Sequence, residues 1–423
     1  MEHQKSYICI DLKSFYASVE CVERGLDPFT TNLVVADPTR SQSTICLAIT
    51  PAMKKLGVKN RCRIHEIPAD IEYITAMPRM QLYMDYSAKI YSLYLRYISK
   101  EDIHVYSIDE CFMDVTDYLT LYDMTAKEMA VSLMDAVMKE TGITATAGIG
   151  TNLYLAKIAM DIMAKHVDDH ICMLDEISYR QKLWDHRPLS DFWRIGSRTE
   201  RKLAGYGIHT MGDIAYASVT SEDWLYKMFG IDAELLIDHA WGLESCGMSD
   251  IKNYHTEEHS LSNGQVLMRN YSYEEAAVVV REMTDVLVLD LVEKGLITSS
   301  ITLWVAYDHR MERPSSHGTL KLASPTNSSL TILDQVVELY RKITDRHIGI
   351  RRIEVTANRV TSEGYLQYDI FTNPIVIEKE KSLQKAILDV KKRYGKNAIM
   401  RGANLLECST YRERNEQIGG HHA

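Results

Sequence analysis

Apolar and polar positions in the first part of the chain follow the alternation expected of strands and helices. A short apolar run at 7–10 predicts a strand, and residues 80–98 form a long, tyrosine-rich stretch with helical spacing. Two short strands around a turn are expected within 102–115, then an amphipathic helix over 125–142 that ends at a glycine, and a strand over 143–150. This strand–helix–strand–strand–helix–strand order is typical of a ferredoxin-like fold, so the pattern predicts the α+β class.

The rest of the chain divides by the same criteria into an insertion, a helical part and a second α+β module. Residues 12–79 interrupt the first module after its first strand, and residues 173–247 contain helices joined by glycine-rich turns. A polar, histidine-containing linker is expected at 248–263. The second module then repeats the β-α-β-β-α-β order, and Ser272 and Glu275 form the capping box of its first helix.

The composition of the 423-residue chain is that of an ordinary globular protein, and its length suggests about two to four domains. The formal net charge of −10 argues mildly against a nucleic-acid partner, but phosphate contacts need only local basic residues. Two such clusters are KKRYGK at 391–396 and the pair Arg351–Arg352. Such clusters are more often a solvated helix end or strand face, so the charge pattern leaves a nucleic-acid partner open without favouring one.

Neither a membrane segment nor a secretory signal is expected. The most apolar stretch, 286–292, is too short to span a bilayer and contains Asp290. Residues 1–7 lack the apolar core of a signal peptide. Eight cysteines are scattered without a C-x-x-C pair, which favours reduced thiols over a disulfide framework or a zinc site. The chain is therefore expected in the cytoplasm, with no membrane partner.

Three acidic residues stand at strand ends where they can meet. Asp11 ends the first apolar run, and Asp109–Glu110 lie at the junction of the two short strands. A ferredoxin-like sheet can place Asp109 beside the end of the first strand, and carboxylates held that close need a cation to stay ionised together. Such oxygen ligands suit Mg²⁺, and two ions can stabilise the attacking and leaving oxygens of a phosphoryl transfer. An Asp-Glu pair alone is weak support, because most such pairs are solvated turns.

Three stretches, in this order and spacing, resemble motifs of the Y-family of translesion DNA polymerases: DLKSFYASVE at 11–20, SIDECFMDV at 107–115 and GIGTNLYLAKIAMD at 148–161. They are most similar to the UmuC-like branch carried by Gram-positive bacteria and their phages. The resemblance covers nearly the whole chain and implies a right-hand polymerase with a ferredoxin-like palm and a helix-hairpin-helix thumb. The implied domains are palm (1–11 and 80–172), fingers (12–79), thumb (173–247), linker (248–263), little finger (264–410) and tail (411–423).

The resemblance implies a role for each of the three acids. Asp11 and Asp109 are expected to bridge two metal ions, and Glu110 to hold the ion that activates the primer 3′-hydroxyl. The backbone carbonyl of Leu12 is a further expected ligand, and Ser107 is expected to support the acidic pair. The implied cofactor is a pair of Mg²⁺ ions, for which Mn²⁺ can substitute.

The residues expected around the incoming nucleotide are Phe15, Tyr16, Lys54 and Lys165. Tyr16 falls at the family's steric-gate position, where its ring would exclude a ribose 2′-hydroxyl, and Phe15 would either back the sugar or belong to the core. Lys54 falls at a fingers position that binds the triphosphate. In most relatives a second phosphate-binding lysine lies seven residues after the equivalent of Lys157. Lys165 is the eighth, and one residue turns a helical side chain by about 100°.

Two fingers positions depart from the pattern of related chains. Pro51 stands where the DinB-like branch carries a tyrosine that packs on the triphosphate, so that contact is expected to be absent. Arg61 replaces a glycine that is usual in this turn, so the loop is expected to differ in shape.

Contacts to DNA are expected from the thumb and the little finger. The stretch 189–210 resembles a helix-hairpin-helix, in which a glycine permits the tight turn and helix N–H groups hold a phosphate. As an isolated pattern it is weak, because many two-helix turns look alike, but its place in the implied thumb strengthens it. The expected contacts are Gly196, Arg198, Arg201, Lys202, Arg351 and Arg352.

The implied function is error-prone translesion DNA synthesis in DNA-damage repair and the SOS response. The expected substrates are template-primer DNA and a dNTP, whose dNMP is transferred to the primer 3′-hydroxyl without proofreading. The alternative is a non-catalytic damaged-DNA-binding or regulatory relative, which would be expected to lack part of the carboxylate set. A nucleotidyl cyclase uses a similar palm but would have neither a thumb nor a second module.

Protein partners implied by the resemblance are a sliding clamp and, in this branch, a recombinase or accessory activator. The C-terminal stretch YRERNEQIGGHHA lacks the paired apolar residues of a clamp-binding peptide. QVLMRNY at 265–271 is a faint internal candidate for such a peptide.

Overall fold

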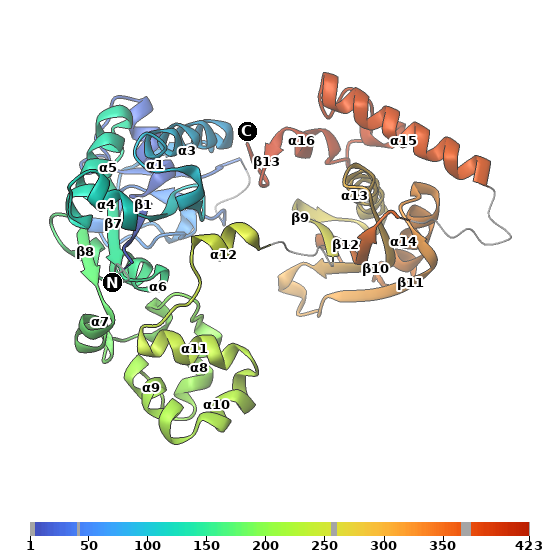
Figure 1. Cartoon of the computed structure of the whole chain (residues 1–423). Helices are drawn as coiled ribbons and strands as arrows, with labels where there is room; N and C mark the ends of the chain where they lie inside the picture. Colours follow the sequence, from blue (N-terminus) through green and yellow to red (C-terminus); the bar gives the residue numbers. More distant parts are fainter. Residues whose placement is uncertain (1–4, 40–42, 255–259, 365–373, 423) are drawn as a thin grey trace. The chain divides into compact units, whose positions relative to one another are not determined.

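The computed structural model divides the chain into two compact units, Met1–Tyr254 and His255–Ala423 (Figure 1). It describes residues 5–39, 43–254, 260–364 and 374–422. The boundary falls within the predicted linker, of which residues 255–259 lie outside the described part of the chain. Helix α12 (Met248–Asn253) and the start of strand β9 at Ser260 occupy the two ends of the predicted linker.

The first unit is built on a five-stranded sheet of order β5-β6-β1-β7-β8. Strands β5, β6, β1 and β7 pair with one another in antiparallel fashion and follow the ferredoxin-like order, which confirms the predicted α+β class. β8 adds a parallel edge beside β7. The strands are β1 (Tyr7–Leu12), β5 (Ile103–Val105), β6 (Glu110–Asp114), β7 (Ala145–Gly150) and β8 (Ile171–Leu174).

Helices α3 (Met80–Tyr94) and α5 (Ala126–Thr141) share the hydrophobic core on one face of this sheet. The Thr125 hydroxyl caps α5 by accepting a hydrogen bond from the Glu128 backbone N–H. Gly142 ends the helix at φ 69, a left-handed conformation that favours glycine and that the sequence pattern predicted. A shorter helix, α4 (Thr116–Leu121), follows β6.

The opposite face of the sheet carries helix α6 (Leu153–Ile158), which packs closely on β1 and β7. Gly150 permits this approach, because a Cβ there would lie 2.2 Å from the Ala156 backbone nitrogen. Side chains alternate along a strand, so Asp11 points to the same face as Cys9, whose side chain packs with α6. The sheet therefore presents its terminal acid to the face that carries α6 and the residues after it.

The segment predicted as fingers starts with α1 (Phe15–Glu23), whose buried face belongs to the palm core. A small sheet of order β3-β2-β4 follows with a core of its own. Arg61 adopts φ 56, so the backbone at this position keeps the left-handed conformation that a glycine favours. The remaining elements are β2 (Leu33–Val35), β3 (Ala48–Ile49), β4 (Ile74–Ala76) and α2 (Pro51–Lys55), which begins with proline as predicted.

A helical part follows β8, as the sequence predicted. Tyr179 anchors it through a hydroxyl that donates to the His239 carbonyl at 3.0 Å. The helices are α7 (Glu176–Leu183), α8 (Ser197–Ala204), α9 (Met211–Thr220), α10 (Glu222–Phe229) and α11 (Asp232–Trp241). Short 3₁₀ turns of the first unit lie at Ile64–Glu66, Lys100–Asp102, Ala164–His166 and Leu189–Asp191.

The second unit confirms the predicted β-α-β-β-α-β order along the chain, but its sheet has the order β11-β10-β12-β9, which differs from that of the palm. The predicted capping box is formed: the Ser272 hydroxyl accepts from the Glu275 N–H, and the Glu275 carboxylate accepts from the Ser272 N–H. The elements are β9 (Ser260–Tyr271), α13 (Tyr273–Glu293), β10 (Leu296–Tyr307), β11 (Ser316–Thr326), α14 (Ser329–Ile343) and β12 (Ile350–Ser362).

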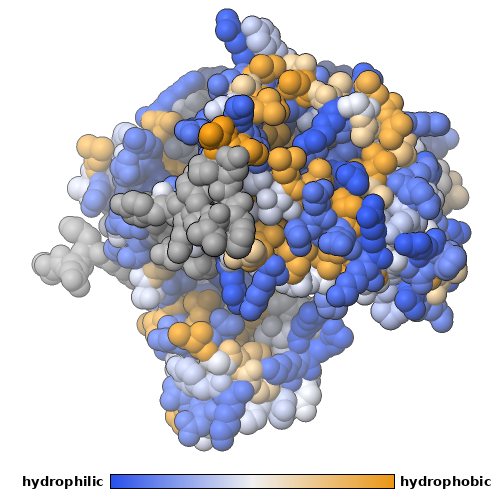
Figure 2. Space-filling model, turned by 90° about the vertical axis from the view of Figure 1, so that its right-hand side faces the viewer, coloured by the Kyte–Doolittle hydropathy of each residue, from blue (hydrophilic) through white to orange (hydrophobic). Residues whose placement is uncertain are grey.

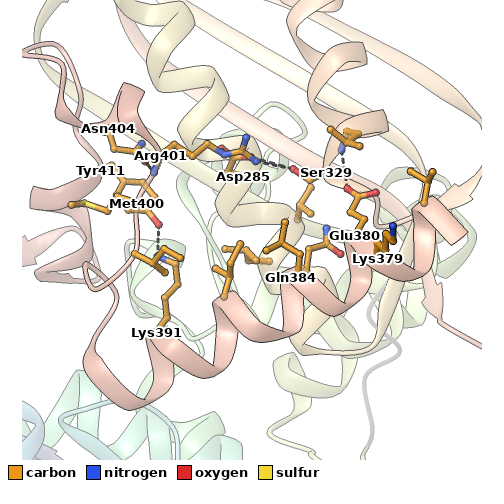
Figure 3. Close-up of a pocket in the computed structure, with 17 residues that line it drawn as sticks. Asp285, Ser329, Lys379, Glu380, Gln384, Lys391, Met400, Arg401, Asn404 and Tyr411 are labelled. Carbon is orange, nitrogen blue, oxygen red and sulfur yellow. Dashed lines mark hydrogen bonds and ion pairs between the residues drawn. The ribbon is translucent and has the colours of Figure 1, made fainter.

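The last part of the chain is more structured than a tail. Helix α15 (Pro374–Tyr394) runs beside α13 and α14, and a cavity of about 480 Å³ lies between these helices and the turn after α15. Figure 3 shows Arg401 paired with Asp285 of α13, and Lys391 of α15 bonded to the Tyr411 hydroxyl. The remaining elements are the 3₁₀ turns His309–Met311 and Gly402–Leu405, α16 (Tyr411–Asn415), β13 (Gln417–Ile418) and β14 (His421–His422).

The surface mixes polar and apolar side chains. In Figure 2, hydrophobic residues are interspersed among hydrophilic ones over the face in view. Several exposed apolar residues of the second unit come from α14 and α15: Leu330, Ile375, Val376 and Leu383. Among the described residues, no helix combines the length and apolar character that crossing a membrane requires.

Candidate active site

The three predicted acids meet at one end of the palm sheet. Asp11 of β1 lies directly opposite Glu110 of β6 in the antiparallel register, so both point to the same face with Cβ atoms about 5 Å apart. Asp109 stands in the adjoining turn, where its carbonyl accepts a hydrogen bond from the Leu12 N–H at 2.9 Å. Residues almost a hundred positions apart in sequence thus form one acidic cluster.

Two neighbours fix the Asp109–Glu110 pair. The Ser107 hydroxyl donates to Asp109 Oδ1 at 2.6 Å, which is the supporting contact expected from the sequence. On the other side, Cys9 Sγ lies 3.3 Å from Glu110 Oε1 and is fully buried. The sequence motifs did not single out Cys9, although its position two residues before Asp11 places it on the same face of β1.

Lys157 is the direct counter-charge of Glu110. Its ammonium lies 2.7 Å from Glu110 Oε1 and 2.9 Å from Asp161 Oδ2, and the two side chains of the first pair are 8% and 10% exposed. Burial raises the pKa of Glu110, and Lys157 opposes that rise. Burial alone would lower the pKa of Lys157, but Asp161, Cys9 and Glu110 hold it above its usual range.

A π-helical turn at Ala159–Met163 places Lys165 beside Asp11. The Lys165 ammonium lies 3.1 Å from Asp11 Oδ2 and 2.9 Å from Asp161 Oδ1. A π turn accommodates one more residue than an α turn, so it absorbs the single-residue offset that the spacing from Lys157 showed. Burial lowers the pKa of Lys165, yet Asp11 and Asp161 keep it above its usual range.

The donor set of this cluster suits a hard divalent cation. Asp11, Asp109 and Glu110 offer carboxylate oxygens, the ligands that Mg²⁺ takes together with substrate phosphates. Burial raises the pKa of Asp11, and the neighbouring Asp109 adds to the rise, so a further cation would relieve a real electrostatic cost. Within the described ranges, no three His, Cys, Asp or Glu side chains are already arranged around a metal position, and lysines pair with Asp11 and Glu110.

The two aromatic residues after Asp11 occupy different environments. Phe15 is 3% exposed and belongs to the palm core, as one of the two sequence interpretations predicted. Tyr16 is half-buried and its ring stacks on Tyr83 of α3, with ring centroids 4.5 Å apart and an interplanar angle of 21°. Sequence reasoning missed Tyr83, which lies 67 residues away in a different helix.

Positive charge gathers near Asp11 from three lysines. Lys54 of α2 is exposed, and desolvation lowers its pKa although Asp11 opposes the change. Lys13 was not among the predicted residues; desolvation and the nearby Lys54 lower its pKa, and its ammonium lies 3.0 Å from the His170 ring. Together with Lys165, these side chains form an anion-attracting group beside the acids. Lys13 could have been found from its place two residues after Asp11.

The predicted thumb contacts fall into two groups. Gly196 precedes the first turn of α8, and a Cβ there would meet nothing within 4 Å. Arg198 and Arg201 are exposed on that helix. The Lys202 ammonium instead donates to the Met228 carbonyl and lies 4.6 Å from the Phe229 ring centroid. Lys202 therefore ties α8 to α10.

The two predicted arginines of the second unit take adjacent positions at the start of β12. Arg352 lies 5.0 Å from the Trp304 ring centroid and 2.9 Å from Glu354 Oε2, on the face opposite the buried core residues of that strand. Arg351 is the next residue back and is half-buried. The QVLMRNY stretch lies within β9, where Leu267 is 1% exposed, so its apolar side chain is held in the core.

Comparison with known proteins identifies the family. The sequence model of the impB/mucB/samB family matches residues 10–161, and that of its C-terminal domain matches residues 258–370. The chain is similar to a protein of Bacillus subtilis named for UV-damage repair, UvrX, with 31% identity over 99% of this chain and 98% of the relative. It is also similar to DNA polymerase IV 2 of the same organism, with 30% identity over 100% of both chains.

A solved structure agrees at the level of the fold. A Y-family DNA polymerase chimera superposes with a TM-score of 0.64 at 22% identity, covering 84% of this chain and 99% of the chimera. Together with the two relatives that align over nearly their full length, this similarity accounts for both units. The chain therefore belongs to the impB/mucB/samB family and, as its three motifs indicated, to the UmuC-like branch of the Y-family DNA polymerases.

Proposed function

We propose that this protein performs error-prone translesion DNA synthesis, transferring a dNMP from a dNTP to a primer 3′-hydroxyl without proofreading. The observation that supports it best is the meeting of Asp11, Asp109 and Glu110 at one sheet end beside cationic side chains. The names of the relatives, UV-damage repair and DNA polymerase IV, point to the same activity. A place in the SOS response is part of this proposal.

The proposed cofactor is a pair of Mg²⁺ ions, with Mn²⁺ as a substitute. Asp11, Asp109, Glu110 and the Leu12 carbonyl would hold them, and the bound ions would supply positive charge to the attacking and leaving oxygens. Lys157 opposes the rise in pKa that burial imposes on Glu110, and Lys165 does the same for Asp11. Both lysines thus favour the ionised carboxylates that metal binding needs.

The nucleotide would lie beside α1 and the lysine group. Lys54 and Lys165, with Lys13, would attract and position the triphosphate, because a phosphate chain carries several negative charges. Tyr16 would exclude a ribose 2′-hydroxyl with its ring. Phe15 would support that ring from within the core, since the two ring centroids are 5.7 Å apart.

Template-primer DNA would contact both units through its backbone. The start of α8 offers unpaired N–H groups after Gly196, with the cationic side chains of Arg198 and Arg201 nearby. In the second unit Arg352 is exposed on the open sheet face, while Arg351 is half-buried beside it. Lys202 would favour binding of the DNA backbone through the positive charge that it adds to α8. Contacts of this kind position DNA without reading its sequence.

A sliding clamp, and a recombinase or accessory activator, remain proposed partners. The buried Leu267 means that QVLMRNY would have to leave β9 to act as a clamp-binding peptide. Substituting Gln265 and Leu267 and measuring clamp affinity tests this stretch; equal affinity would exclude it.

The test of the proposed activity is Mg²⁺-dependent primer extension on undamaged and lesion-containing templates. Asp109→Ala combined with Glu110→Ala should abolish extension while DNA binding persists. Asp117→Asn, an exposed acid on helix α4 beyond the far end of β6, is the matched control and should extend like the native protein. If the doubly substituted protein extends primers at the native rate, the site assignment is wrong.

The same assay distinguishes the proposed polymerase from the alternative, a non-catalytic damaged-DNA-binding or regulatory protein. That alternative predicts binding of template-primer DNA with no incorporation under any metal condition. The complete set of Asp11, Asp109 and Glu110 at one sheet end favours the enzyme.

A further inference from the structure

The ring of Tyr16 rests on one specific partner. Tyr83, from the first turns of α3, is fully buried, and its ring stacks on Tyr16 with centroids 4.5 Å apart. Tyr16 itself is half-buried. Burial is the main cause that raises the pKa of its phenol, and the negative charge of Asp109 adds to the rise. One face of the Tyr16 ring is therefore backed by a second aromatic ring.

A buried carboxylate holds Tyr83 in turn. The Tyr83 hydroxyl donates to Glu20 Oε1 at 2.8 Å, and the Glu20 side chain has no exposed surface. Glu20 lies four residues after Tyr16 on α1, so both side chains project from the same side of that helix. The three residues Tyr16, Tyr83 and Glu20 thus form a closed arrangement between α1 and α3.

Two arginines complete this arrangement. Arg79, immediately before α3, binds Glu20 in a bidentate manner, with Nε 2.9 Å from Oε1 and Nη2 2.8 Å from Oε2. Arg24, the residue that directly follows α1, pairs with the same carboxylate. Burial raises the pKa of Glu20, but the hydrogen bonds from Arg79, Arg24 and Tyr83 outweigh it and leave the pKa below the usual value. Glu20 is therefore a fixed anion that cannot turn away from Tyr83.

Packing of the core does not by itself explain a buried carboxylate at this position. A buried charged group is costly, and an apolar residue of similar volume could occupy the Glu20 position with equal or better stability. The charge adds a defined orientation. Bidentate pairing fixes the orientation of the carboxylate, and the carboxylate fixes the position of the Tyr83 hydroxyl. Stacking on the Tyr83 ring then fixes the ring of Tyr16. A side chain that discriminates by steric exclusion must be held in place, because a ring that can tilt admits the larger substrate.

From this geometry we infer that Tyr83 and Glu20 are positioning residues for sugar selection: they hold the Tyr16 ring against the space a ribose 2′-hydroxyl would need. The inference rests on the proposed function, and specifically on Tyr16 as the steric gate. It assigns sugar discrimination to an arrangement of three side chains on two helices.

The test measures the ratio of kcat/KM for dCTP to that for CTP in single-nucleotide primer extension. Loss of a stacked aromatic pair corresponds to about a two- to tenfold change, so Tyr83→Leu should lower the ratio by about that factor through faster CTP incorporation. Tyr83→Phe keeps the ring and should retain more of the ratio than Tyr83→Leu. Glu20→Gln keeps the shape but weakens the arginine pairing, and should also lower the ratio.

The matched control is Tyr94→Leu. Tyr94 is a fully buried tyrosine of the same helix and core, so its loss reproduces the packing defect without touching Tyr16. A purely structural role for Tyr83 predicts lower thermal stability in both variants with an unchanged ratio. A positioning role predicts a changed ratio in the Tyr83 and Glu20 variants alone. In a Tyr16→Ala background, Tyr83→Leu should have no additional effect on the ratio.

The outcomes separate this inference from the proposed function. A native protein that extends no primer with dNTPs refutes the proposed function and this inference with it. An active native protein whose ratio is unchanged in Tyr83→Leu, or in Glu20→Gln if the leucine variant does not fold, refutes the inference alone.

Discussion

Replacing Lys157 with methionine removes the cation that faces Glu110 while it keeps much of the side-chain volume. In the native structure the ammonium lies 2.7 Å from Glu110 Oε1 and 2.9 Å from Asp161 Oδ2, and the lysine side chain is 8% exposed. Removing one partner of a buried pair costs about 3–5 kcal/mol, because the other charge is left uncompensated. We expect a loss of about 3 kcal/mol near neutral pH, since Glu110 can take up a proton instead.

The pH dependence of that loss has a defined sign. Without Lys157, the pKa of Glu110 in the folded protein rises further above its unfolded value, because burial already raises it. A group with a raised folded-state pKa contributes stability that is present below the unfolded pKa and is lost as the pH rises through the folded pKa. The difference in unfolding free energy between native and Lys157→Met should therefore widen as the pH rises above the ordinary pKa of a glutamate.

Urea unfolding followed by tryptophan fluorescence measures the loss. A Trp304→Phe background leaves four tryptophans, all in the first unit, so the signal reports that unit alone. Lys157→Met with Glu110→Gln removes both charges and should recover much of the stability. The control is Lys127→Met, which breaks an exposed ion pair with Asp169 and should change little. A loss no larger than that of the control, or a double variant as unstable as the single, would refute the counter-charge role.

Three further outcomes follow from the structure. Gly150→Ala should lower the melting temperature of the first unit, because its Cβ would lie 2.2 Å from the Ala156 nitrogen; an unchanged melting temperature would contradict the close packing of α6. Glu275→Gln should be less stable than the native protein at neutral pH, and the difference should vanish as the pH falls toward 2. The hydrogen bond from Arg269 is the largest of the causes that lower the pKa of Glu275 to about 2. The stability that a lowered pKa contributes is lost when the carboxylate is protonated. Lys165→Met should raise the KM for dNTP in primer extension more than it lowers kcat, because the lysine is proposed to bind the triphosphate; an unchanged KM would remove it from the site.

Much of the fold could be predicted from local sequence. The capping box at Ser272 and Glu275 and the glycine end at Gly142 depend only on residues within one or two helical turns. The β-α-β-β-α-β order of both modules follows from hydrophobic periodicity, which is also a local property. Asp11 and Asp109–Glu110 could be singled out because each stands at the end of an apolar run, and the motifs around them supplied the family.

The sequence did not determine which side chains face those residues. The pairing of Glu110 with Lys157, the stack of Tyr16 on Tyr83 and the strand order of the second sheet join residues far apart along the chain. In a regular helix, the spacing from Lys157 would turn the Lys165 side chain away from the phosphate-binding position. The π turn at Ala159–Met163 brings it beside Asp11. Periodicity defines which face a residue takes within its own element, whereas a contact between elements depends on register, packing and helix irregularity. These are set by the balance of burial and pairing over the whole unit, which is why only the tertiary structure decided them.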